Sequence, residues 1–169
     1  MGNLKLLLDT HVLLWWLFDE PKLWKCPFII SRFFLNDIYQ HNQLKTENRE
    51  INFGHLLCSV ARTHISNPYN DIYVSSASAW EIATKYRIGK MPEAKELLQN
   101  YSAILQQACF TELPVTTTHA LKAGLLPIKH RDPFDRMLMA QAELENLAII
   151  TYDSAFYFEH LTIIPPPKG

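Results

Sequence analysis

Cysteine and glycine are scarce in this chain, with three and five copies among 169 residues. The cysteines, Cys26, Cys58 and Cys109, lie far apart and include no Cys-x-x-Cys pair. They therefore fit neither a disulfide framework nor a zinc site, and we expect reduced thiols in a cytoplasmic protein. The glycines form neither a Gly-x-x-x-x-Gly-Lys loop nor a Gly-x-Gly-x-x-Gly turn, which argues against nucleotide binding through such loops.

The chain also lacks an excess of one charge and a long hydrophobic run. Its 16 lysines and arginines oppose 17 aspartates and glutamates, so no overall basic surface marks a nucleic-acid binder. The longest apolar stretch near the start, residues 11–18, is too short to cross a bilayer, and we expect no membrane partner. Because 48% of the residues are hydrophobic, we expect a single globular domain over residues 1–169.

Short apolar segments alternate with longer segments of helical spacing. Strands are expected at residues 4–8, 72–74, 110–115, 147–151 and 161–164. Helices are expected at residues 12–18, 76–87, 93–107, 117–125 and 133–145, with Gly89 closing the second and Pro133 starting the last. This alternation predicts an α/β fold of three layers, in which helices cover both faces of a parallel sheet.

One segment, residues 24–58, does not follow the alternation. It makes the connection between the first helix and the second strand much longer than a compact α/β fold requires. Two interpretations stay open for it: an additional helical hairpin or lid, and an insertion that partly lacks a fixed structure.

Four acidic residues stand where strands give way to helices. Asp9 follows the first expected strand, Asp153 follows the fourth, and Glu81 and Asp135 lie near the starts of two helices. In an open parallel sheet these points share one edge, where ligands usually bind. Carboxylates gathered there repel one another unless a cation lies between them, so the pattern points to a divalent-metal site.

Helix capping is the alternative explanation for the same residues. Capping positions or capping-box spacings involve Asp9, Thr10, Ser78 with Glu81, Asp132 with Asp135, and Asp153. Helix N-termini in a parallel sheet all lie at the same edge, so their clustering is not independent support for metal binding. Capping and metal binding therefore both stay open for each residue taken alone.

Two observations favour a metal site. Glu81 lies in the apolar segment Ala77–Ala83, where a buried carboxylate is costly unless something compensates its charge. Asp9 and Asp153 both follow strongly apolar strands, which belong at the centre of a sheet. Acids that end central strands face the ligand crevice.

Four segments carry a family resemblance: residues 6–15 (LLLDTHVLLW), 74–82 (VSSASAWEI), 130–138 (HRDPFDRML) and 150–153 (ITYD). In this order and spacing they resemble the PIN-domain nucleases and, within them, the VapC-type toxins of bacterial toxin–antitoxin pairs. The resemblance extends over nearly the whole chain except residues 24–58. If that segment is removed, Leu23 joins a stretch from Ser59 that is similar to the family's second helix.

The resemblance implies an endoribonuclease that hydrolyses RNA phosphodiester bonds. Asp9, Glu81, Asp135 and Asp153 would be the catalytic acids that hold Mg²⁺ or Mn²⁺, while Asp132 would be a helix cap. Thr10 corresponds to a hydroxyl position near the metal. Candidates to hold substrate phosphates are Arg131, Arg136, Lys85 and Lys129.

The resemblance also implies partners: an RNA substrate, with transfer RNA as one candidate, a homodimer, and a small antitoxin that carries the complex to operator DNA. We hypothesise that the segment 24–58 leaves the chemistry intact and alters antitoxin docking. Two alternatives remain. One is a catalytically inactive or insertion-impaired relative that only binds. The other is a phosphatase of haloacid-dehalogenase type, which is disfavoured because His11 stands where a second Asp is needed.

Overall fold

A computed structural model describes residues 3–19, 59–157 and 160–165 of the chain. Its strands are β1 (Lys5–Leu8), β2 (Asp71–Ser75), β3 (Thr111–Leu113), β4 (Ala148–Ile150) and β5 (Ile163–Ile164). Its α-helices are α1 (Thr10–Asp19), α3 (Ser59–Ser66), α4 (Ser76–Arg87), α5 (Lys95–Gln99), α6 (Tyr101–Gln107), α7 (Thr117–Leu125) and α8 (Pro133–Glu145). Two short 3-10 helices are η4 (Pro92–Ala94) and η5 (Ser154–Phe156).

The five strands form one parallel sheet in the order β3-β2-β1-β4-β5. The central strand β1 pairs with β2 on one side and with β4 on the other. The chain therefore changes its direction of winding at β1, and the crevice beyond the carboxyl ends of β1 and β4 is the place where such sheets bind ligands.

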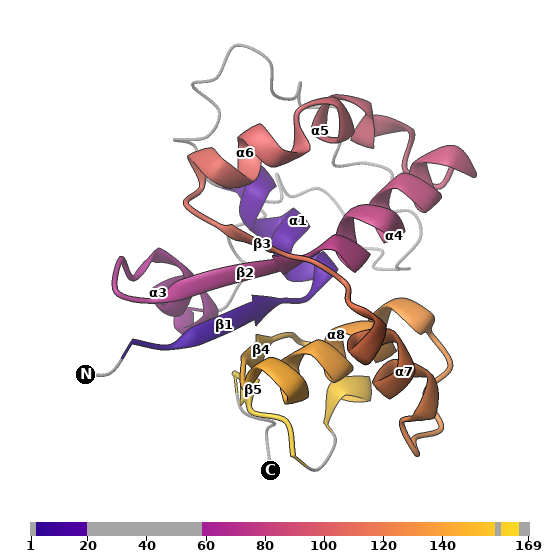
Figure 1. The fold of residues 1–169 in the computed structure, drawn as a ribbon. Coiled ribbons are helices and arrows are strands. Elements are labelled where there is room, and N and C mark those ends of the chain that lie inside the picture. The colour runs from indigo at the N-terminus through magenta and orange to yellow at the C-terminus, as the bar shows by residue number, and fades with distance from the viewer. Residues whose placement is uncertain (1–2, 20–58, 158–159, 166–169) are drawn as a thin grey trace, which may run out of the picture.

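Alternation along the buried strands separates two hydrophobic clusters. Leu6 and Leu8 pack in one cluster with residues of α1, α3, α4, α5 and α6. Leu7, between them, points to the other face and packs with Leu138 and Met139 of α8. Figure 1 shows the same arrangement, with α1, α4, α5 and α6 on one side of the sheet and α7 and α8 on the other. The predicted α/β fold with helices on both faces is confirmed.

The helices predicted at residues 76–87, 117–125 and 133–145 are present with those bounds. Gly89, just beyond α4, has a φ of 73°, a left-handed conformation in which glycine is not strained. The capping box predicted from Ser78 to Glu81 is wrong. Ser75 caps α4 instead, because the helix already begins at residue 76 and Ser75 Oγ accepts a hydrogen bond from Ala77 N.

The single helix predicted over residues 93–107 is also wrong, because η4, α5 and α6 replace it. The break between α5 and α6 lies at Asn100, whose backbone angles of −123° and 19° are not helical. Its side-chain amide donates to the carbonyl of Glu96 at 3.1 Å. Asparagine commonly breaks helices through such local side-chain bonds, which compete with the backbone ladder.

The segment 24–58, with Cys26 and Cys58, lies outside the described residues, so its two interpretations and the single-domain assignment stay predictions. In the part of the chain that the structure describes, no helix is long and apolar enough to span a membrane.

Candidate acidic site at the sheet edge

Asp9 occupies the centre of the site because it ends the central strand β1. Its backbone N–H donates to the carbonyl of Ile150 on β4 at 3.1 Å, and its side chain is nearly inaccessible, with 3% of the residue exposed. Oδ2 accepts a hydrogen bond of 2.7 Å from the hydroxyl of Thr151. Oδ1 accepts a longer bond of 3.3 Å from the N–H of His11.

The charge of Asp9 is only partly compensated by these contacts. Burial raises its pKa above the ordinary value, and the nearby negative charge of Glu81 raises this pKa further. The charge of His11 and the hydrogen bond from Thr151 act in the opposite direction, but burial outweighs them. Asp9 and Glu81, which lie far apart in the sequence, therefore interact through space.

Glu81 reaches the site from α4, whose position is fixed by a buried hydrogen bond. Thr10 Oγ1 donates to Ser78 Oγ at 2.9 Å, which ties the first residue of α1 to the turn of α4 before Glu81. Glu81 is 6% exposed, and its Oε1 forms an ion pair of 2.6 Å with Nζ of Lys85, one turn further along α4. The costly buried carboxylate expected from the sequence thus has a cation beside it.

Asp135 reaches the site from the first turn of α8, on the opposite layer. A hydrogen bond of 2.6 Å joins its Oδ2 to Nε2 of His130. Burial raises the pKa of Asp135 to about 6, and the charges of Asp132 and Asp9 add to this effect. The effect of Asp9 on this pKa indicates that the acid after β1 and the acid in α8 lie within electrostatic range of each other.

Asp132 and Asp153 cap helices. Asp132 Oδ1 accepts from Phe134 N at 2.8 Å at the start of α8, and Asp153 Oδ1 accepts from Ala155 N at 2.8 Å at the start of η5. Both residues are exposed. Asp9 therefore lies within electrostatic range of both Glu81 and Asp135, whereas Asp153 caps η5 just after β4.

Thr151 is a site residue that the sequence reasoning did not single out. Its hydroxyl donates to Asp9 Oδ2 and accepts from Asp153 N at 3.1 Å, so it links the ends of β1 and β4. The sequence signal was a threonine directly after an apolar strand, and in the structure this threonine is fully buried. The Glu81–Lys85 pair was also readable, because residues four apart on a helix are neighbours.

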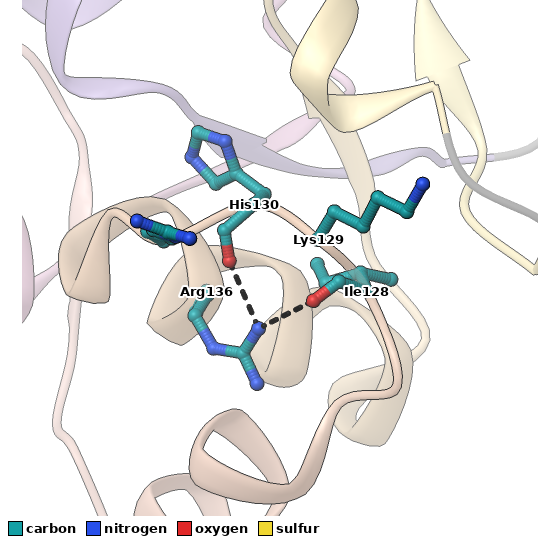
Figure 2. A pocket seen from close by; sticks show the side chains of 5 residues that line it. Ile128, Lys129, His130 and Arg136 are labelled. Carbon is teal, nitrogen blue, oxygen red and sulfur yellow. Dashed lines mark hydrogen bonds between the residues drawn. The ribbon is translucent and has the colours of Figure 1, made fainter.

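Arg136, expected as a phosphate contact, is instead bound to the backbone. Its five N–H groups donate to the carbonyls of Ala123, Gly124, Leu126, Ile128 and His130, at 2.8–3.3 Å. A guanidinium has five N–H donors, so this one is fully used. Figure 2 shows two of these bonds, to Ile128 and His130.

The connection that Arg136 holds borders a basic hollow of about 520 Å³, lined by Ile128, Lys129, His130, Arg131 and Arg136. In Figure 2 the side chain of Lys129 points away from the Arg136 guanidinium. Lys129 and Arg131 are exposed, and within the described residues neither has an ion-pair or hydrogen-bond partner for its charged group. Of the two arginines predicted to hold phosphate, Arg131 is therefore the available one.

The donor set fits a hard divalent cation in its chemistry, because such ions take carboxylate oxygens as ligands and a positive charge would offset the burial of Asp9 and Asp135. Lys85 and His130 now lie against two of these carboxylates. In this arrangement the described residues contain no group of three or more His, Cys, Asp or Glu side chains that could hold a metal ion. Glu81 and Asp135 would have to turn from Lys85 and His130 toward Asp9 to share one.

The order of the parallel strands and the acids at the end of the central strand agree with the family that the sequence comparison identifies. The sequence profile of the PIN domain family matches residues 51–159, more than half of the chain. The chain belongs to the PIN domain family.

Two known proteins are similar to the chain, one in sequence and one in fold. Ribonuclease VapC16 of Mycobacterium tuberculosis is 29% identical to the chain over 102 residues, which are 59% of this chain and 66% of that protein. The chain thus spans just under two thirds of this relative. The crystal structure of VapBC2 from Rickettsia felis, bound to a DNA fragment from their promoter, matches with a TM-score of 0.52 and 14% identity, over 95% of this chain and 97% of that one. The VapC-type resemblance is confirmed.

Proposed function

We propose that the protein is a divalent-metal-dependent endoribonuclease that a cognate antitoxin neutralises. The observation that carries this proposal is the convergence of Asp9, Glu81 and Asp135, from β1, α4 and α8, on the carboxyl edge of the central strands. Repulsion between Asp9 and each of Glu81 and Asp135 is unfavourable unless a cation offsets it. Their presence in a chain similar to a ribonuclease of the VapC type supports a metal-dependent hydrolase.

In this proposal Asp9, Glu81, Asp135 and Asp153 hold Mg²⁺ or Mn²⁺. When bound, such an ion supplies an activated water and stabilises charge on the phosphate that is cleaved. The protein's own groups supply the rest. Thr151 holds Asp9 through a hydrogen bond of 2.7 Å, and Thr10 fixes α4 through Ser78, which supports the position of Glu81.

Substrate binding falls to the basic side of the site. Arg131 and Lys129 adjoin Asp135 along the chain and offer uncommitted charges for RNA phosphates. Arg136 supports this loop through its carbonyl bonds, and so serves binding by holding the backbone. Because the net charge is −1, local contacts rather than overall attraction must select the RNA.

Lys85 and His130 have a role of their own in this proposal. Lys85 contacts Glu81 and His130 contacts Asp135, at 2.6 Å each, and both contacts would have to open if these carboxylate oxygens held a metal ion. An ammonium group released from Glu81 remains near the site and can contact a substrate phosphate.

The oligomeric state, the location and the partners are proposed from the similarity to VapC-type proteins. We propose a homodimer in the cytoplasm, RNA with transfer RNA as a candidate target, and operator DNA bound only through the antitoxin. The Rickettsia felis complex with promoter DNA supports the last point by similarity of fold. Residues 24–58 precede α3, so we propose that they alter antitoxin docking. Unchanged antitoxin affinity after their deletion would contradict this.

A second candidate function is a relative that binds partners and does not cleave RNA. The pairing of Lys85 with Glu81 and of His130 with Asp135 favours it, because both carboxylates are already satisfied. Manganese titration separates the two candidates. An active site binds Mn²⁺ and loses that binding in Asp9→Asn, whereas a silent relative shows no binding that depends on Asp9.

The deciding experiment is cleavage of total RNA and transfer RNA by the wild-type protein with Mg²⁺ or Mn²⁺, compared with Asp135→Asn. We expect discrete fragments from the wild type only. If the folded wild type binds Mn²⁺ and still cuts none of these RNAs, the nuclease proposal is wrong.

A further inference from the structure

An exposed aromatic pair lies beside the acidic site. Trp80 is 59% exposed, although tryptophan is usually well buried, and its ring meets Phe134 edge-on, with centroids 4.8 Å apart and planes at 71°. Trp80 immediately precedes Glu81 in α4, and Phe134 immediately precedes Asp135 in α8. The two helices come from opposite layers, so the pair bridges them at the edge that carries the carboxylates.

We propose that this Trp80–Phe134 pair is a stacking platform for an unpaired base of the RNA substrate, next to the phosphate that is cleaved. The proposal rests on the proposed ribonuclease function and specifies its substrate as single-stranded at that base. An edge-on contact that leaves more than half of Trp80 exposed keeps ring surface available, and any base can stack on it.

Charge next to the pair favours a nucleic acid over a protein as the occupant. Phe134 follows the loop that carries Lys129 and Arg131, whose charges have no partner in the described part of the chain. Glu81 and Asp135 directly follow the two rings in the sequence, and a bound metal ion would offset their charge. Aromatic rings next to uncommitted basic groups are typical of single-strand binding grooves, while bases in a duplex are already stacked and paired.

The experiment measures binding of three fluorescein-labelled probes to the full chain in EDTA, where a metal-dependent enzyme cannot cut them. The probes are a short oligouridylate, an abasic oligomer of the same length, and the oligouridylate annealed to its complement. Trp80→Leu is compared with Trp80→Phe and with Ile88→Ala. Ile88 is the matched control, because it is 49% exposed and caps the far end of the same helix, seven residues beyond Glu81.

We expect Trp80→Leu to bind the oligouridylate about tenfold more weakly, while its weak binding to the abasic and annealed probes stays the same. Trp80→Phe keeps most of the affinity, and Ile88→Ala keeps all of it. Equal binding of the oligouridylate by wild type and Trp80→Leu overturns the proposal. A Trp80→Leu protein that changes its mass in solution with unchanged RNA binding also overturns it, since the pair is then a protein interface.

Cleavage with Mg²⁺ or Mn²⁺ keeps this inference separate from the proposed function. If the wild type cuts RNA and Trp80→Leu binds and cuts it equally well, the stacking proposal is wrong and the ribonuclease proposal is supported. If the wild type cuts no RNA, the ribonuclease proposal is wrong, and the binding measurements with the three probes decide whether Trp80 stacks on a base.

Discussion

Two groups of carboxylates share one edge of the sheet and differ in what holds them. Asp132 and Asp153 are exposed and accept short backbone bonds of 2.8 Å as helix caps. Asp9, Glu81 and Asp135 are more buried and contact a hydroxyl, an ammonium and an imidazole, respectively. Burial raises the pKa values of Asp9 and Asp135. An acid at the end of a strand is therefore no evidence of chemistry by itself. Asp9, Glu81 and Asp135 differ from Asp132 and Asp153 in being more buried and in lacking a short capping bond.

The largest expected effect comes from neutralising the most buried acid. Asp9→Asn should lower metal-dependent RNA cleavage by more than about 100-fold, since even residues that support metal ligands commonly contribute 10–100-fold. Asp132→Asn is the matched control, because asparagine is as good a cap as aspartate. Initial cleavage rates of both variants test this, and comparable losses in the two would erase the distinction between the groups.

Two arginines near the site differ in the same way: the Arg136 guanidinium is bound to backbone carbonyls, whereas the Arg131 guanidinium has no partner among the described residues. Arg136→Ala leaves five carbonyls of the loop between α7 and α8 without their donor. We expect a loss of about 2–4 kcal/mol in the free energy of unfolding. Arg131→Ala should change it by less than about 0.5 kcal/mol. Urea denaturation measures both, and equal stabilities would show that the carbonyl bonds contribute little.

The pKa of Asp135 predicts how stability depends on pH without metal. The folded protein keeps this proton up to about pH 6, whereas the unfolded chain releases it near pH 4. The folded state thus binds more protons in between, and the free energy of unfolding falls as the pH rises through this window, by about 1–3 kcal/mol. The raised pKa of Asp9 acts in the same direction.

Denaturation in EDTA from pH 4 to pH 7 measures this dependence. Asp135→Asn should flatten it, and Mn²⁺ should stabilise the wild type mainly at the upper end of the range, where the carboxylates are charged. A wild-type protein that gains stability from pH 4 to pH 6 contradicts a raised pKa of Asp135 in the folded state.

The sequence predicted the frame of the molecule better than its site. Apolar strands separated by helical segments identify a parallel sheet, because burial on both faces leaves few other folds. The break at Asn100 was missed, since the apolar spacing continues through it. Within the candidate site, the sequence named the acids as candidates and did not name their partners. The cap formed by Asp153 is a local contact that the sequence pattern offered. The hydrogen bond from Thr151 to Asp9 joins residues 142 positions apart, which no local pattern encodes.

Lys85 offers a smaller effect in the opposite direction. Its ammonium competes with a metal ion for Glu81, so Lys85→Met should bind Mn²⁺ several-fold more tightly in calorimetry, because a like charge near the ion is removed. Lys90→Met, beyond the end of α4 and exposed, is the control with the same change in charge. Weaker Mn²⁺ binding by Lys85→Met than by this control would mean that Lys85 positions Glu81 for the ion.

The smallest effect is expected at Asp153, where capping and metal binding still compete as explanations. Asp153→Asn preserves an acceptor for the N–H of Ala155, so the free energy of unfolding should stay the same. If Asp153 also helps to hold the ion from outside the site, Mn²⁺ affinity should fall by only a few-fold, far less than in Asp9→Asn. Calorimetric titration of both variants measures this. The expected effect is small because the Asp153 carboxylate is exposed to water and already accepts a backbone hydrogen bond. An unchanged Mn²⁺ affinity in Asp153→Asn would mean that Asp153 acts only as a helix cap and that three acids form the site.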